Sequence, residues 1–201
     1  MPGGSASPAT GCCRCADPNW TLANLPCTRC LDRGEVLDRT LPLFAYRFPV
    51  DGLIVRAKFR RQPFWLESLA WAGLGRIPAA LLSTLAGAVL IPVPLHRNRL
   101  SERGYNQAEL LARTLSRALS LPCRTDLVVR SQATAQQARL GAAARQQNLR
   151  GAFRLIGMPP RHVILVDDVM TTGATLCSLA GTLRAAGTEE VSVIVLARAS
   201  G

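Results

Sequence analysis

The 201-residue chain is predicted to adopt an α/β fold, in which a mainly parallel sheet flanked by helices follows a small N-terminal cysteine module. Three observations predict this organisation. Five of the seven cysteines lie within the first thirty residues, apolar runs of strand length alternate with segments of helical periodicity, and one apolar run leads into a turn rich in hydroxyl groups. Hydrophobic residues make up 48% of the chain, which is enough to bury a core and excludes wholesale disorder.

The cysteines near the N-terminus predict a metal site. Cys12 and Cys15 form one C-x2-C pair, and Cys27 and Cys30 form another. Two such turns complete a tetrahedral zinc site, and four thiolate ligands leave no open position for substrate, so the predicted zinc is structural. The metal would supply folding energy that about thirty residues cannot obtain from a core of their own. Two alternatives remain: Cys13 could replace Cys12 as a ligand, or the thiols could form disulfides, although a cytosolic chain keeps its thiols reduced.

Strands and helices are expected to alternate after this module. The expected strands are a strand-like stretch at 41–50 and segments at 89–93, 127–129, 162–166 and 191–197. The expected helices begin with 52–61 and continue with 64–74, 79–86, 106–119 and 176–186, the last of them ended by Gly187. The continuous apolar runs at 162–166 and 191–197 are typical of strands buried on both faces of a parallel sheet.

One uncharged stretch has nearly the length of a membrane span. Residues 77–95 contain no charge, but Pro92 and Pro94 interrupt the stretch, so a helix followed by a buried strand explains it better. The first eleven residues have neither the basic nor the apolar region of a secretory signal. We therefore expect no membrane span and a cytoplasmic location.

The segment at 163–175, VILVDDVMTTGAT, carries the clearest chemical signal. Asp167 and Asp168 follow an apolar strand, where carboxylates can accept hydrogen bonds from sugar hydroxyls. The turn after them precedes a helix, whose N-terminus offers backbone N–H groups and a partial positive charge to a phosphate. A ribose 5-phosphate carries both groups, hydroxyls for the carboxylates and a phosphate for the helix N-terminus. The alternative, that the carboxylates merely end a strand and the turn merely caps a helix, fits less well because all the parts occur in order. No Gly-Lys-Ser/Thr follows, so the segment is not a P-loop.

The chain is strongly basic, with 24 Lys and Arg residues, 13 Asp and Glu residues and a net charge of +11. Such a charge favours anionic partners, although the base composition of a GC-rich genome explains it equally well. Residues 131–150 lie in a stretch with no acidic residue between Asp126 and Asp167. This stretch is interpreted as a mobile basic loop or hairpin that closes over an anion, or alternatively as a solvated helix face.

The 163–175 segment resembles the phosphoribosyl pyrophosphate (PRPP) signature of type I phosphoribosyltransferases. The chain from Cys12 to Ala199 is similar to the ComF family, which adds a four-cysteine N-terminal module to that fold. Other matching stretches are residues 58–60 (Lys-Phe-Arg), 91–95, 103–107 and a spaced series from Arg130 to Phe153. Ala133 and Ala144 depart from this series, where the family commonly has Pro and Glu.

The resemblance implies a zinc module and connector at residues 1–45 and a phosphoribosyltransferase-like domain at 46–201. It also implies Mg²⁺, bound through oxygen ligands to the pyrophosphate. Asp167 and Asp168 would hold the ribose hydroxyls and are the catalytic candidates. The implied PRPP-binding residues are Asp167, Asp168, Val169, Met170, Thr171, Thr172, Gly173, Ala174 and Thr175. The candidates for a pyrophosphate loop are Pro94, Leu95, Arg97 and Arg99, and those for a flexible loop are Arg139 and Arg145.

Two functions are compatible with this resemblance. The first is an enzyme of nucleotide metabolism that transfers the phosphoribosyl group of PRPP to a nitrogen acceptor and releases pyrophosphate. The second is a non-catalytic accessory factor for the uptake of single-stranded DNA in natural competence, or for DNA utilisation, with single-stranded DNA and DNA-uptake proteins as partners. Aromatic residues make up only 5% of the chain, which disfavours a dedicated base-stacking groove but not contact with the phosphate backbone. The acceptor, catalysis itself and the oligomeric state are left open.

Overall fold

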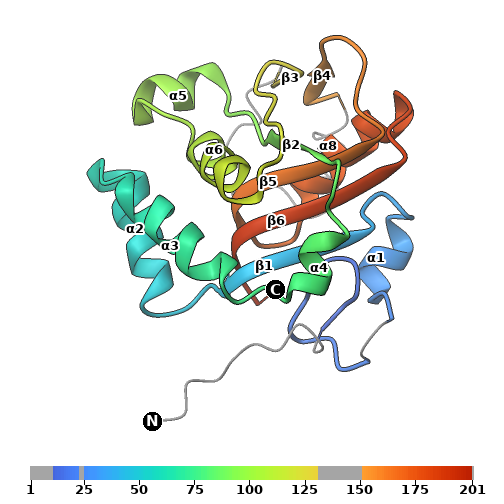
Figure 1. Cartoon of the computed structure of the whole chain (residues 1–201), viewed down its shortest axis with the longest axis horizontal. Helices are drawn as coiled ribbons and strands as arrows, with labels where there is room; N and C mark the ends of the chain where they lie inside the picture. Colours follow the sequence, from blue (N-terminus) through green and yellow to red (C-terminus); the bar gives the residue numbers. More distant parts are fainter. Residues whose placement is uncertain (1–10, 23–24, 131–150, 201) are drawn as a thin grey trace, which may run out of the picture.

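A parallel sheet forms the centre of the molecule (Figure 1). The computed structural model describes residues 11–22, 25–130 and 151–200. Within these residues the sheet has four parallel strands in the order β1-β6-β5-β2. Their bounds are Arg39–Ala45 for β1, Val89–Pro92 for β2, His162–Met170 for β5 and Glu190–Arg198 for β6. The fold therefore has the predicted α/β class.

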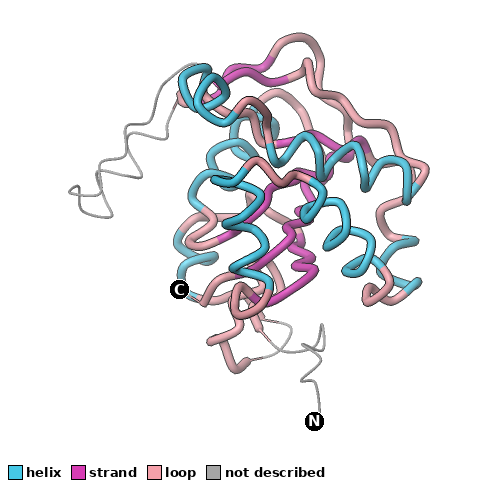
Figure 2. The backbone as a smooth tube through the Cα atoms, turned by 90° about the vertical axis from the view of Figure 1, so that its left-hand side faces the viewer, coloured by secondary structure: helices cyan, strands magenta, loops and turns pink. Residues whose placement is uncertain are grey.

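Helices cover both faces of the sheet, and Figure 2 shows the strands running between them. Ile164 and Val166 of β5 pack with helices α2, α3 and α6, whereas Val163 and Leu165 face the cluster that contains helix α8. Neighbouring residues of a strand point to opposite faces, so a run buried on both sides must be apolar throughout. The bounds of these helices are Val50–Arg60 for α2, Phe64–Leu74 for α3, Gln107–Leu119 for α6 and Ala174–Ala185 for α8.

Shorter elements complete the described chain. Strands β3 (Val128–Arg130) and β4 (Phe153–Leu155) form a small antiparallel pair. Helices α1, α4 and α5 span Thr28–Asp32, Ala79–Ser83 and Arg97–Arg103. The uncharged stretch at 77–95 forms α4 and β2, as a helix followed by a strand, and none of the described helices is both long and apolar enough to traverse a bilayer.

The cysteine module, which we define as residues 11–22 and 25–34, packs on the α8 side of the sheet. Its four clustered cysteines belong to the same hydrophobic cluster as Val193 of β6 and Leu179 of α8. Strand β1 follows the module and pairs with β6, with Leu41 beside Ile194. Strand β1 lies within the predicted module and connector at residues 1–45, so this part of the chain contributes a strand to the core sheet.

The structure differs from the predicted elements in two places that affect the site. Strand β5 continues to Met170, four residues beyond the predicted end at Val166, because its pairing with β6 extends to Met170 beside Arg198. Arg97 and Arg99, which are candidates for a loop after Val93, belong to helix α5, and His96 caps this helix by accepting a hydrogen bond from the N–H of Asn98.

Helix α3 approaches β1 so closely that only glycine fits at position 73. A Cβ atom there would lie 2.6 Å from the Cβ of Leu43 and 3.0 Å from a ring carbon of Phe44. We expect Gly73→Ala to lower the free energy of unfolding by about 1–3 kcal/mol, because overpacking outweighs the gain in helix propensity. Gly181→Ala in α8 is the matched control, since its Cβ would contact nothing within 4 Å, and we expect it to stabilise by up to about 1 kcal/mol. Denaturant unfolding of both variants tests this; equal effects would contradict the packing argument.

Candidate functional site

The candidate site lies at the carboxyl ends of β5 and β2. These strands are neighbours, and the N–H of Val93 donates to the carbonyl of Val166 over 2.9 Å. The sheet therefore brings Asp167 and Asp168 next to the stretch that begins at Pro94. Ligands of open α/β sheets bind at this edge.

Asp168 is 8% exposed and forms an ion pair with the only lysine in the chain. The Nζ of Lys58, near the end of α2, lies 2.9 Å from each oxygen of the Asp168 carboxylate. Tyr105 holds this part of α2 in place by donating a hydrogen bond to the carbonyl of Ala57. The sequence analysis did not place Lys58 in the site. The available signal was that Lys58 is the single lysine in a chain with many arginines.

Asp167 has a different environment. Its Oδ1 accepts a hydrogen bond of 2.8 Å from the backbone N–H of Asp168. Burial and the neighbouring Asp168 charge raise the pKa of Asp167 to about 7, and the charges of Lys58 and Arg130 offset this shift only in part. Both the protonated and the ionised forms of Asp167 are consequently populated near neutral pH.

The β5–α8 turn, which consists of Thr171, Thr172 and Gly173, leads directly from these carboxylates into helix α8. Thr171 and Thr172 are exposed, and the hydroxyl of Thr172 accepts a hydrogen bond of 3.4 Å from the N–H of Ala174. Gly173 has φ +75°, and a Cβ there would collide with the side chain of Met170. The turn thus places two exposed residues at the N-terminus of α8, the kind of helix end at which anions can bind. Val169 and Met170 end β5, while Ala174 and Thr175 begin α8.

The pyrophosphate-loop candidates are divided between a short connection and helix α5. Pro94 and Leu95 lie between β2 and α5, whereas Arg97 and Arg99 belong to α5 itself. The Asn106 side chain donates to the carbonyl of Val93 over 3.1 Å and so ties the start of α6 to this connection.

One further arginine, Arg130, interacts electrostatically with the candidate site. Burial and the charge of Arg99 lower the pKa of Arg130, and the charge of Asp167 offsets part of this shift. The three charged groups therefore influence one another. The flexible-loop candidates Arg139 and Arg145 lie outside the described residues.

The cysteine cluster fits a tetrahedral metal. Cys12, Cys15, Cys27 and Cys30 are buried, and their four Sγ atoms lie within 4.8 Å of one another. The Sγ atoms of Cys12 and Cys30 are 3.8 Å apart, and those of Cys15 and Cys27 are 3.7 Å apart. These spacings match the roughly 3.8 Å edge of a tetrahedron with Zn–S bonds of about 2.3 Å, and they far exceed a disulfide bond.

A backbone donor also faces the cluster. The N–H of Cys27 donates to the Sγ of Cys12 over 3.2 Å, a contact that favours a thiolate ligand. Cys13 is exposed and is not part of the cluster. Of the two ligands left open by the sequence, the structure therefore favours Cys12.

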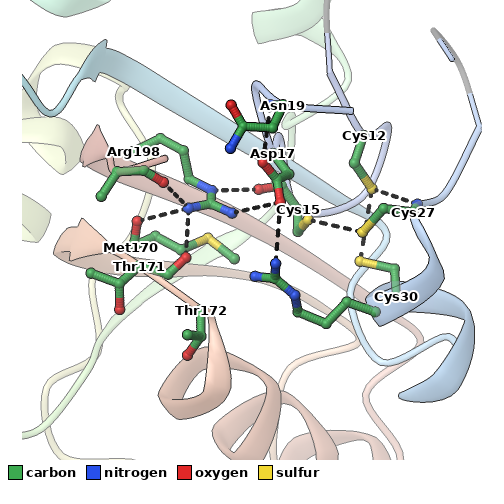
Figure 3. A network of polar contacts seen from close by, with 12 residues as sticks. Cys12, Cys15, Asp17, Asn19, Cys27, Cys30, Met170, Thr171, Thr172 and Arg198 are labelled. Atoms are coloured by element: carbon green, nitrogen blue, oxygen red, sulfur yellow. Dashed lines mark hydrogen bonds and ion pairs between the residues drawn. The ribbon is translucent and has the colours of Figure 1, made fainter. Parts of the chain in front are cut away.

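The cysteine module contacts the β5–α8 turn through a buried arginine that the sequence did not single out (Figure 3). Arg198, at the end of β6, is 3% exposed, and its Nε donates to the carbonyl of Cys15 over 3.0 Å. Its Nη1 donates to the carbonyls of Met170 and Thr171 over 3.2 and 2.5 Å, and also to that of Ala199. The carboxylate of Asp17, in the cysteine module, lies 3.8 Å from Nη2. A charged residue at the end of a long apolar strand was the only local signal of this contact.

Comparison with known proteins places this geometry in context. Residues 105–201 match the family described as the phosphoribosyl transferase domain. The chain is 40% identical over 181 residues to "Competence protein F" of Haemophilus influenzae, covering 86% of this chain and 78% of that protein. It is 37% identical over 194 residues to "DNA utilization protein YhgH" of Escherichia coli strain K12, covering 94% and 84%. "Competence protein ComFC" of Bacillus subtilis is 38% identical over 89 residues, covering 44% and 35%.

We expect the purified protein to contain about one zinc ion per chain, as a four-thiolate site requires. Cys27→Ser should lose the metal and lower the midpoint of thermal unfolding, because Cys27 belongs to the buried cluster. Cys13→Ser is the matched control and should keep both, since its side chain is exposed. Metal analysis by mass spectrometry combined with thermal unfolding tests this. A fully folded chain without metal, or equal losses in both variants, would contradict the assignment.

Proposed function

Because the chain belongs to the ComF family, we propose that it is an accessory factor of DNA uptake or DNA utilisation that binds PRPP together with Mg²⁺. The observation that carries the ligand assignment is the succession of the carboxylate pair Asp167–Asp168 and the β5–α8 turn at one edge of the sheet. The names of the relatives and the basic charge of the chain support the role in handling DNA. The proposed setting is the cytoplasm, where reduced thiols can hold a metal.

The proposed ligand places two chemical groups on two sets of protein atoms. The ribose hydroxyls would donate to the carboxylates of Asp167 and Asp168, and the 5-phosphate would accept hydrogen bonds from N–H groups of the β5–α8 turn. Mg²⁺ would arrive with the pyrophosphate and offset part of its charge. Arg97 and Arg99 on α5 are the proposed cations on the pyrophosphate side.

Lys58 keeps Asp168 ready for this role. The ammonium group of Lys58 lies 2.9 Å from the Asp168 carboxylate and supplies the counter-ion that this buried group requires. Each carboxylate oxygen has two acceptor positions, so a ribose hydroxyl can share Asp168 with Lys58. Asp168 thus does not have to lose its counter-ion when a sugar binds.

Phosphoribosyl transfer is a second candidate, which the pKa of Asp167 favours. A carboxylate that titrates near pH 7 is suited to act as a general base. In this reaction, a nitrogen acceptor attacks C1 of the ribose while the C1–O bond to pyrophosphate breaks. Pyrophosphate would be the leaving group, with its charge offset by Mg²⁺ when the ion is bound, and the carboxylate of Asp167 would take the proton of the acceptor. Release of pyrophosphate that depends on an added nitrogen acceptor would identify this activity.

We expect Asp168→Asn to weaken PRPP binding by roughly 10- to 100-fold, because a neutral amide replaces a charged hydrogen-bond acceptor. Asp126→Asn is the matched control, since that exposed carboxylate pairs with Arg124 outside the proposed site. Calorimetric titration with PRPP and Mg²⁺ measures the affinities, and circular dichroism checks the fold. Equal affinities of wild type and a folded Asp168→Asn variant would remove the ribose assignment.

The affinity for PRPP should also rise with pH through the titration of Asp167. The raised pKa of about 7 means that the carboxylate is mostly protonated below neutrality and mostly ionised above it. Between about pH 6 and pH 8 we expect an increase of up to about tenfold beyond the effect of the ligand's own phosphate groups. Asp167→Asn supplies that baseline in parallel titrations. Identical pH profiles for the wild type and Asp167→Asn would show that Asp167 does not contact the ligand.

A further inference from the structure

Two arginines hold the β5–α8 turn against the cysteine module. Arg33, just after α1, donates from Nη1 to the carbonyl of Thr172 over 2.7 Å. Arg198 donates to the carbonyl of Thr171 over 2.5 Å and to that of Cys15 in the module over 3.0 Å. The carbonyls of Thr171 and Thr172 therefore each accept a hydrogen bond from a guanidinium group that lies on the side of the module.

These two hydrogen bonds fix the orientation of two peptide groups. The carbonyl of Thr171 shares a planar peptide with the N–H of Thr172, and the carbonyl of Thr172 shares one with the N–H of Gly173. In a trans peptide the C=O and N–H bonds point in opposite directions. Anchoring both carbonyls on the module therefore directs the N–H groups of Thr172 and Gly173 away from it. Those N–H groups are the donors that a phosphate at the start of α8 would use.

The position of Arg198 depends in turn on the fold of the module. A buried cation is stable only where it is paired and hydrogen-bonded. The Asp17 carboxylate, 3.8 Å from Arg198, is also buried, and the carbonyl of Asp17 accepts a hydrogen bond of 3.2 Å from the N–H of Cys12. Arg29 of α1 lies 3.5 Å from the same carboxylate. The cysteine-bearing turn thereby supplies both the counter-ion and one acceptor for Arg198.

We propose that Arg33 and Arg198 are positioning residues through which the cysteine module orients the backbone donors for the ligand's 5-phosphate. This inference rests on the proposed function, because it concerns the same ligand. The module is then a part of the phosphate site, although it supplies no atom that contacts the phosphate.

Arg33→Gln is the decisive variant, because Arg33 is only half-buried whereas replacement of the buried Arg198 threatens folding. We expect this variant to bind ribose 5-phosphate, a probe with only the sugar and the phosphate, about three- to tenfold more weakly than the wild type. Its metal content and thermal midpoint should remain those of the wild type. Arg33→Lys restores a charged donor and should recover part of the affinity, which a merely structural role would not produce.

Arg14→Gln is the matched control. Arg14 is also in the cysteine module, but it pairs with Glu35 instead of the turn, so its removal should leave the affinity unchanged. Calorimetric titrations of the full-length wild type and the three variants distinguish a failure of the proposed function from a failure of the positioning role. If the wild type binds neither ribose 5-phosphate nor PRPP, the proposed function is overturned. If the wild type binds and Arg33→Gln binds equally well, only the positioning role is overturned.

Discussion

The guanidinium of Arg198 lies where the end of β6, the cysteine module and the β5–α8 turn meet. A cation with only 3% of its surface exposed requires hydrogen-bond acceptors and a counter-ion. Carbonyls from three segments and the carboxylate of Asp17 provide them. The three segments come from distant parts of the sequence, and the contacts of this one side chain join them where the β5–β6 ladder ends.

The cysteine module is too small to stabilise itself by burial, and two features compensate. Its four thiols have the spacing of a tetrahedral zinc site, and the same cysteines pack into the hydrophobic cluster that lies under α8. The module and the sheet thus share one core. The neighbouring strand β1 lies in the sheet itself, so the N-terminal part of the chain is not a separate appendage.

The sequence predicted well what local patterns determine. Apolar runs identified β5 and β6, the repeated C-x2-C spacing identified the cysteine cluster, and the order of strand, carboxylates, turn and helix at 163–175 is that of the structure. Contacts between distant residues were not predictable, because no local pattern encodes them. The pairing of Lys58 with Asp168, across 110 positions, and the hydrogen bond from Arg33 to Thr172, across 139, belong to this class. The extension of β5 to Met170 also depends on a partner strand, since Asp167 and Asp168 alone disfavour a strand.

The most direct test of this account is an amide-resolved ¹H–¹⁵N spectrum of the zinc-loaded protein, titrated with PRPP and Mg²⁺. The account predicts that the amides of Thr172 and Gly173 show some of the largest downfield shifts, as expected for N–H groups that donate to a phosphate. Saturable binding that leaves these two amides unshifted would contradict the claim that the cysteine module orients them toward the ligand.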